Sequence, residues 1–179
     1  MQRFAVPRPT RRLRSNFLGI AATTPAAPGL DGPLWSLRWL AAHGGAGVST
    51  LVTLTGIGHD AGAVWPADDG SGRIPLVLVC RAHATGTSVA ATLVEQWRTS
   101  PALRHVHLLG LVVVAASPKP VPALVTGRLL LTTGWVANQW WIGWQDAYVA
   151  VDDPRAVGPS PDVTALRDGL LPLLGEARS

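Results

Sequence analysis

The sequence predicts a three-layer α/β domain with a mainly parallel sheet of about five strands. Short apolar stretches alternate with helical stretches along most of the chain, which is typical of a parallel sheet covered by helices. Two apolar runs, Leu76–Cys80 and Val106–Ala116, are continuous, as in strands that are buried on both faces. The length of 179 residues, with 47% apolar residues, fits one domain with a substantial core.

Residues 1–34 differ in composition from the rest, and we expect them to form a disordered leader rich in arginine and proline, followed by the domain at residues 35–179. The leader has no acidic residue before Asp31, and it carries Arg3, Arg8, Arg11, Arg12 and Arg14. The formal net charge of +4 therefore resides in this leader. Such a segment is either simply solvated or binds nucleic acid or anionic lipid.

The first half of the chain predicts three strands and two helices. An apolar strand at 36–42 runs into a glycine cluster, and a short helix at 49–57 ends among further glycines. A second strand is expected at 61–65, and the third follows Pro75 at 76–80. The next helix is capped by Thr87 or Ser88 and ends near Thr99, with apolar residues at helical spacing.

The second half predicts two strands and two helices. The strand at 106–116 is ended by Ser-Pro-Lys-Pro, and a helix at 122–132 follows. An aromatic strand at 138–144 would place Trp140, Ile142 and Trp144 on one face and Trp141 on the other. The last helix is expected at 163–174 with Asp162 as its N-terminal cap.

The glycine cluster after the first strand is the segment with a recognisable chemical pattern. Glycines allow a tight turn in which backbone N–H groups converge on an anion, and the following helix N-terminus adds partial positive charge. The hydroxyl of Ser49 stands where a phosphate-binding loop would bind Mg²⁺. The candidate residues are His43, Gly44, Gly45, Ala46, Gly47, Val48, Ser49 and Thr50.

This loop resembles that of the ParA/MinD-like (deviant Walker A) branch of P-loop ATPases, whose pattern is Lys-Gly-Gly-x-Gly-Lys-Ser/Thr-Thr. The resemblance implies a P-loop NTPase-like, Rossmann-like domain. The sequence is more similar still to a family of actinobacterial proteins that resemble proteins of conjugative plasmids and other mobile elements. That family shares the His-Gly-Gly-Ala-Gly-x-Ser-Thr loop and a strand end that corresponds to residues 80–86 here. The resemblance covers residues 35–150.

Two departures from the ATPase pattern argue against hydrolysis. His43 and Val48 replace both lysines, and neither strong strand ends in the acidic residue that would hold Mg²⁺ and water. A charge-assisted hydrogen bond contributes about 1.5–3 kcal/mol, so loss of the lysine weakens nucleotide binding roughly ten- to a hundredfold. Phosphate, ATP or ADP remain candidate ligands, whereas the sequence gives little support for Mg²⁺.

Arg81, His83 and Lys119 are candidate replacements for the missing charge, because they follow the two strong strands at the edge where α/β sheets bind ligands. The alternative is that Arg81 and His83 are a surface arginine and a loop histidine. The loop itself has three interpretations: it is kept only for tight packing, it binds a phosphate or nucleotide, or it binds another small ligand.

Other chemistry has weaker signals. Cys80 lies within a buried run and is expected to be inert, and His105 and His107 lack a third metal ligand. No apolar run is long enough to cross a membrane, and no secretory signal is present, so we expect a cytoplasmic protein. The tryptophans are expected mainly in the core, with one face available to an interface.

These observations lead to one main functional hypothesis and two alternatives. The main one is a catalytically degenerate P-loop module that acts as an interaction or assembly component with an unidentified protein partner, in transfer or maintenance of a mobile element. The first alternative is an active ATPase completed in trans by a partner. The second is a nucleic-acid-binding accessory protein that uses the arginine-rich leader, in which case deletion of residues 1–16 abolishes salt-sensitive DNA binding.

Overall fold

The computed structural model describes residues 36–70 and 72–176. The predicted leader at 1–34, with its five arginines, lies outside the described residues. Among the described residues, no helix is long and apolar enough to cross a membrane.

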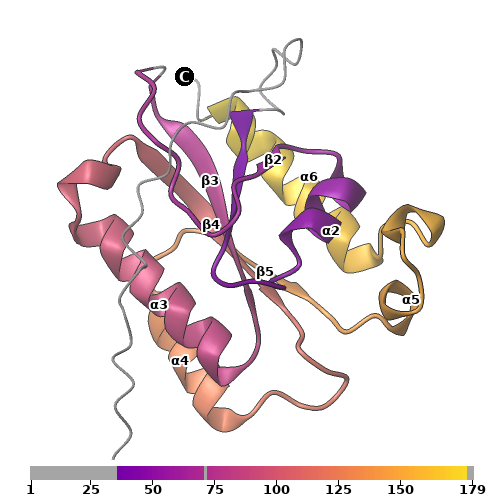
Figure 1. The fold of residues 1–179 in the computed structure, drawn as a ribbon. Coiled ribbons are helices and arrows are strands. Elements are labelled where there is room, and N and C mark those ends of the chain that lie inside the picture. The colour runs from indigo at the N-terminus through magenta and orange to yellow at the C-terminus, as the bar shows by residue number, and fades with distance from the viewer. Residues whose placement is uncertain (1–35, 71, 177–179) are drawn as a thin grey trace, which may run out of the picture.

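A five-stranded sheet forms the centre of the domain, and all of its strand pairs are parallel, which confirms the predicted sheet (Figure 1). Its strands are β1 (Arg38–Ala41), β2 (His59–Asp60), β3 (Ile74–Arg81), β4 (Val106–Val114) and β5 (Gln139–Ile142). They are arranged in the order β2-β1-β3-β4-β5. This is the strand order of flavodoxin-like doubly wound sheets.

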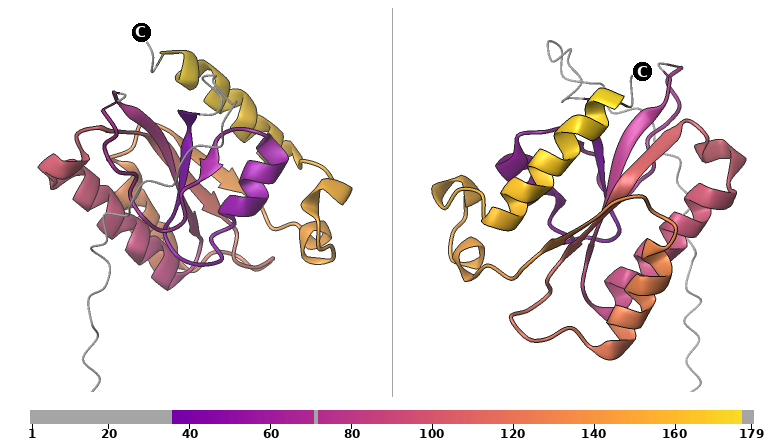
Figure 2. Two further views of the ribbon diagram at one scale, coloured as in Figure 1. Left: turned by 45° about the horizontal axis from the view of Figure 1, so that its top comes forward. Right: turned by 180° about the vertical axis from the view of Figure 1, so that it is seen from behind.

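Helices cover both faces of the sheet, so the domain has three layers (Figure 2). The helices are α2 (Val48–Thr55), α3 (Ala84–Thr99), α4 (Ala123–Thr133), α5 (Asp146–Val149) and α6 (Pro161–Glu176), with 3-10 turns η1 (Pro101–Leu103) and η2 (Pro154–Ala156). α2 and α6 pack on one face, and α3 and α4 on the other. The connections between parallel strands therefore run on both sides of the sheet.

The continuous apolar run of β3 is explained by burial on both of its faces. Val77 and Val79 belong to the core beneath α2 and α6, whereas Leu76, Leu78 and Cys80 belong to the core beneath α3 and α4. Successive side chains of a strand alternate between faces, so both faces require apolar residues here. Burial raises the pKa of the Cys80 thiol to about 12, which keeps it protonated and unreactive.

The second strand is shorter and earlier than the predicted strand at 61–65, so that prediction is wrong. β2 contains only His59 and Asp60, and the chain then turns at Gly62, whose N–H donates to the Asp60 carboxylate over 2.7 Å. Trp65 packs against the core beneath α3 and donates from its indole N–H to Gln96 over 3.3 Å. Ala61 and Gly62 still form backbone hydrogen bonds with β1, and beyond them the chain leaves the sheet and Trp65 covers it.

Two predicted helix caps are also wrong. α3 begins at Ala84, ahead of Thr87 and Ser88, and its cap is His83, whose Nδ1 accepts the Gly86 N–H over 3.0 Å.

At the last helix, the Ser160 hydroxyl accepts the Val163 N–H over 3.4 Å. The predicted cap, Asp162, lies within the first turn of α6 and accepts the Gly143 N–H over 2.8 Å. Asp162 therefore fastens the end of β5 to α6. The remaining predicted boundaries differ by one or two residues from those observed.

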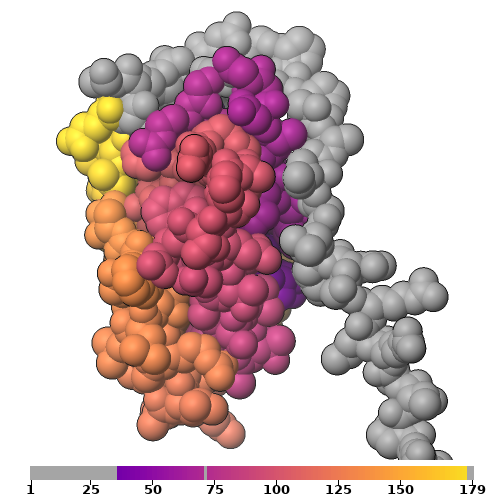
Figure 3. All heavy atoms as spheres, turned by 90° about the vertical axis from the view of Figure 1, so that its left-hand side faces the viewer, coloured from indigo at the N-terminus to yellow at the C-terminus, as the bar shows by residue number. Residues whose placement is uncertain are grey.

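Apolar side chains remain exposed on the outer side of α4 and at β5. Figure 3 shows the face of the molecule that carries α3, drawn in pink, beside α4 and later segments, drawn in orange. The exposed residues on and just after α4 are Leu124, Leu130, Leu131 and Trp135. Trp141 of β5 is 45% exposed while Ile142 is buried, as the alternation of the predicted strand required.

After β1 and after β3, the chain turns to opposite faces of the sheet. β1 and β3 are neighbours in the sheet, but β1 leads to α2 on one face and β3 leads to α3 on the other. The loops diverge at this position, which leaves a crevice at the carboxyl ends of the two strands. Residues 42–47 and 82–83 therefore lie at the place where doubly wound sheets bind ligands.

Candidate functional site

The loop between β1 and α2 is a tight turn that depends on glycine. The Ala46 N–H donates to the His43 carbonyl over 3.2 Å. Gly45 has φ of 77° and Gly47 has φ of 102°, both in the left-handed region that other residues avoid. Ala46 is buried while Gly44 and Gly45 are exposed, so the backbone of the turn faces outward.

The N-terminus of α2 has no side-chain cap. Its cap residue is Gly47, and within the described part of the chain no protein acceptor bonds to the N–H groups of Val48, Ser49 or Thr50. The first N–H groups of a helix require an acceptor, and an anion supplies one that the helix dipole also favours. The Val48 side chain is 4% exposed and packs in the core with Leu51. The position expected to carry a lysine therefore serves packing.

Arg81, at the end of β3, lies against this loop. Its Nε donates to the Gly45 carbonyl over 2.9 Å, and its guanidinium also donates to the Ala115 carbonyl over 3.4 Å. Through these bonds, the side chain at the end of β3 joins the loops that follow β1 and β4. The side chain of Arg81 thus contacts the glycine loop, which is the arrangement that a replacement of the missing charge requires.

The rings of His43 and His83 contact each other at the crevice, with centroids 4.9 Å apart and planes inclined by 46°. The Nε2 of His43 accepts the Arg81 backbone N–H over 3.3 Å, so its Nδ1 carries the proton and donates to the Gly44 carbonyl over 2.8 Å. His83 uses its Nδ1 as the cap of α3. Both rings thus accept hydrogen bonds in their neutral forms, and they connect the two loops.

Burial lowers the pKa of His83, and the neighbouring His43 and Arg81 lower it further. The same packing explains Gly86. A Cβ at this position would approach the Arg81 carbonyl oxygen to 2.5 Å and His43 Nε2 to 2.8 Å. The glycine in the first turn of α3 therefore allows the histidine pair to form.

Asp60 is the site residue that sequence reasoning missed. It lies at the end of edge strand β2, and its carboxylate accepts the Ser49 hydroxyl over 2.9 Å. In the sequence, Asp60 flanks the predicted second strand, but nothing there places it at the loop, because β2 has only two residues and no apolar run. The turn residue Gly62, which follows Asp60 closely, was the available signal for a strand end here.

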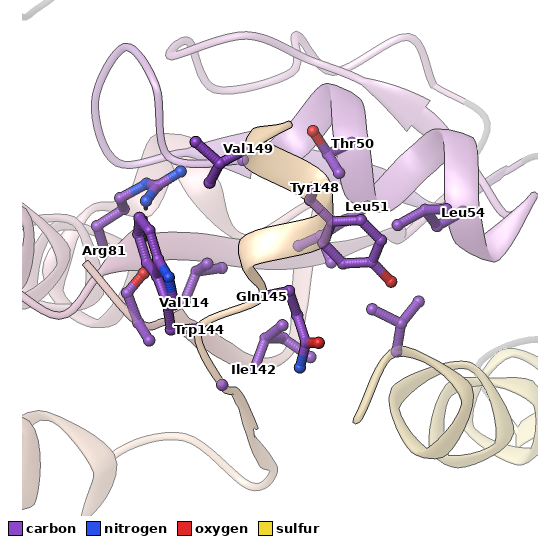
Figure 4. Close-up of a pocket in the computed structure, with 14 residues that line it drawn as sticks. Thr50, Leu51, Leu54, Arg81, Val114, Ile142, Trp144, Gln145, Tyr148 and Val149 are labelled. Carbon is purple, nitrogen blue, oxygen red and sulfur yellow. Dashed lines mark hydrogen bonds between the residues drawn. The ribbon is translucent and has the colours of Figure 1, made fainter. Parts of the chain in front are cut away.

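Two hollows adjoin at the loop. One of about 400 Å³ is lined by residues 43–50 with Asp60 and Arg81. The other, of about 130 Å³, lies between α2, the end of β5 and α5 (Figure 4). The structure therefore brings together every predicted loop residue and Arg81.

His83 contacts this group through His43, whereas Lys119 lines neither hollow. Lys119 lies in the exposed connection between β4 and α4, where its backbone N–H donates to the Ser117 hydroxyl over 3.3 Å. Within residues 36–70 and 72–176, no three His, Cys, Asp or Glu side chains gather as metal ligands.

Comparison of the chain with protein-family models, with curated proteins and with solved structures gave no match.

Proposed function

We propose that this domain binds a phosphate group, free or as part of a small molecule, at the loop of residues 43–50. It does so without hydrolysing a nucleotide and acts as an interaction or assembly component. The proposal includes the P-loop-like character of the loop, its kinship with ParA/MinD-like proteins, a cytoplasmic location and a role in a mobile element.

The observation that supports phosphate binding most directly is that Arg81 and the uncapped start of α2 line the same hollow. A guanidinium has five N–H donors, and the two bonds to the Gly45 and Ala115 carbonyls leave the others available. An anion here would meet helix N–H groups and a positive charge together. Arg81 would thus supply the charge that Val48 lacks.

The absence of hydrolysis in this proposal follows from the same geometry. Transfer of a phosphoryl group requires positive charge that stabilises the developing negative charge, together with a bound Mg²⁺. Val48 packs in the core, and the guanidinium of Arg81 is held in place by hydrogen bonds to the Gly45 and Ala115 carbonyls. This arrangement favours binding over turnover.

A direct test is thermal shift and titration calorimetry with inorganic phosphate, ADP, ATP and GTP. We expect at least one of these to stabilise the protein. Gly47→Asp places a carboxylate at the helix N-terminus and should abolish that stabilisation, and Arg81→Ala should weaken binding roughly ten- to a hundredfold.

Gly70→Asp is a matched control, since Gly70 has φ of 74° in an exposed turn that lines neither hollow. It should retain binding. If no anion stabilises the wild-type protein, or if Gly47→Asp binds as well as Gly70→Asp, the proposal is wrong.

The contact between Ser49 and Asp60 favours the second candidate, an ATPase completed in trans. A serine hydroxyl and a carboxylate beside a phosphate-binding loop are ligands of the type that hold Mg²⁺. Phosphate release should then require Mg²⁺ and a partner protein, and Asp60→Asn should abolish it. Turnover of this kind would replace the non-hydrolysing proposal.

The role in assembly is supported by the exposed apolar face of α4. Leu131 is 77% exposed and Leu130 is 71% exposed, and exposed apolar groups that adjoin one another are typical of interaction surfaces. The first partner to test is a second copy of the chain, because a two-fold contact needs only one such face. Analytical ultracentrifugation over a concentration series should show a dimer that Leu131→Glu disrupts.

A further inference from the structure

The narrower hollow adjoins the hollow at the phosphate-binding loop. Gly47, Thr50 and Arg81 line both hollows, so the second hollow lies within one residue of a ligand held at the loop. Figure 4 shows Trp144 beside Arg81, and α5 with Tyr148 and Val149 opposite α2. We refer to this second hollow as the ring groove.

The two aromatic side chains offer only their ring surfaces to the ring groove. The Trp144 indole N–H donates to the Asp146 carboxylate over 2.8 Å. The Tyr148 hydroxyl donates to the Gly158 carbonyl over 2.9 Å and accepts the Ser160 N–H over 2.6 Å. Because these polar atoms are already paired within the protein, the half-buried rings favour a flat apolar surface as their partner.

The rest of the ring groove combines apolar walls with a small polar edge. Leu51 and Leu54 of α2 form one wall, and Val149 at the rim is 68% exposed. Thr50 and Gln145 also line it, and among the described residues neither side chain has a hydrogen-bond partner. A ligand surface that is flat and apolar, with hydrogen-bonding atoms at its edge, matches this lining.

We propose that the ring groove binds a heteroaromatic ring attached to the phosphate at the loop. The ligand class is therefore a phosphorylated heteroaromatic compound, as opposed to free phosphate or a sugar phosphate. The ring stacks on Trp144 and Tyr148, and Gln145 and Thr50 bond to its edge. This inference rests on the proposed phosphate-binding function, and the following experiment separates the two.

The experiment compares three probes by titration calorimetry: ribose 5-phosphate, AMP and FMN. The first carries only the phosphate and sugar, whereas the other two add a heteroaromatic ring of different size. Stacking of one ring contributes enough for about a five- to 150-fold gain in affinity. We therefore expect AMP or FMN to bind at least about fivefold more tightly than ribose 5-phosphate.

Trp144→Ala removes the stacking surface and should cancel most of that gain, while the affinity for ribose 5-phosphate stays within error. Val149→Gln at the exposed rim tests the same groove with little risk to folding. Val157→Gln is its control, because Val157 is also exposed and apolar but does not line the ring groove. This control should behave as wild type with all three probes.

Three results would overturn the inference while leaving phosphate binding intact. The ring compounds could bind no better than ribose 5-phosphate, or the groove variants could weaken all three probes equally. The third is AMP binding that Gly47→Asp abolishes but neither groove variant changes. If no probe binds the wild-type protein at all, both the inference and the proposed function are wrong.

Discussion

The N-termini of α2 and α3 differ, although both helices start where neighbouring parallel strands end. Gly47 starts α2 with a left-handed backbone and no side-chain cap, whereas His83 starts α3 in an extended conformation and accepts the Gly86 N–H. The first N–H groups of α2 thus remain available to a ligand, while α3 satisfies one of its own. The two helix N-termini, although similarly placed in the sheet, therefore differ in whether they can bind a ligand.

The histidine pair connects these two ends. His43 belongs to the loop before α2, and it accepts the N–H of Arg81, which belongs to the strand before α3. The capped helix therefore fixes the strand end from which Arg81 reaches Gly45. We infer that the N-terminus of α3 supports the site and that the N-terminus of α2 forms it. The following substitutions test this difference.

Gly86→Ala should have the largest effect. Its Cβ would lie 2.5 Å from the Arg81 carbonyl oxygen, so the backbone must move. We expect the free energy of unfolding to fall by about 3 kcal/mol, measured by urea denaturation. Gly127→Ala in exposed α4, where no atom lies within 4 Å of the added Cβ, should instead stabilise the protein slightly. Equal effects of the two changes would contradict a supporting role for α3.

Gly47→Ala should lower the free energy of unfolding less than Gly86→Ala does, but it should weaken phosphate binding more. The added Cβ meets only Val114 at 3.8 Å, so the cost comes from the φ of 102° and amounts to about 1–2 kcal/mol. A shift of the backbone to relieve this strain would misplace the N–H groups of α2. Calorimetry should show weaker phosphate binding at a temperature where the variant remains folded. Unchanged affinity would mean that the geometry of this turn is not required.

His83→Asn should make stability less sensitive to acid. The lowered pKa of His83 means that the unfolded chain takes up the proton first, near its ordinary value of 6.5. This contribution to stability is therefore complete above about pH 6.5 and is lost as the pH falls below it.

Asparagine keeps a cap for α3 but does not titrate. The difference in Tm between pH 7.5 and pH 5.5 should be smaller in His83→Asn than in wild type. His59 and His107, whose pKa values are also lowered by burial, should leave a residual difference. A variant with the full wild-type difference would show that the cap is not the acid-sensitive contact.

Ser49→Ala should have the smallest effect on stability. The Ser49 hydroxyl that donates to Asp60 is exposed, so its loss should change the free energy of unfolding by less than about 1 kcal/mol. Phosphate binding without Mg²⁺ should be retained, because the N–H groups of α2 are unaffected. Loss of binding in a metal-free buffer would show that the hydroxyl itself contacts the anion.

The sheet was predictable because its central strands are buried on both faces. The central residues of β3 and β4 lie in the two cores and are apolar on both faces, so their sequence alone distinguishes them. β2 escaped prediction since two residues at a sheet edge leave no periodic signal. The predictions of the two helix caps were wrong because Thr87 and Asp162 are residue types that usually cap helices. Local geometry instead makes His83 and Ser160 the residues that accept the first helix N–H groups.

The candidate site was predictable only in part. Gly45 and Gly47 reveal themselves by residue type, since few other residues adopt positive φ. Arg81 followed from its place after a buried strand. Asp60 and the ring groove required the fold, because Ser49 lies in α2 and Asp60 at the end of β2, and Trp144 lies far along the chain from Leu51.

The sequence by itself determined that this chain forms a parallel α/β sheet with a glycine turn after its first strand. Burial and backbone conformation restrict the residue types at those positions, and such restrictions are local. Only the tertiary structure decided that Val48 packs inward, that Arg81 reaches Gly45, and that Asp60 meets Ser49. Strand order brings these residues together, and strand order depends on long-range packing that no local pattern encodes.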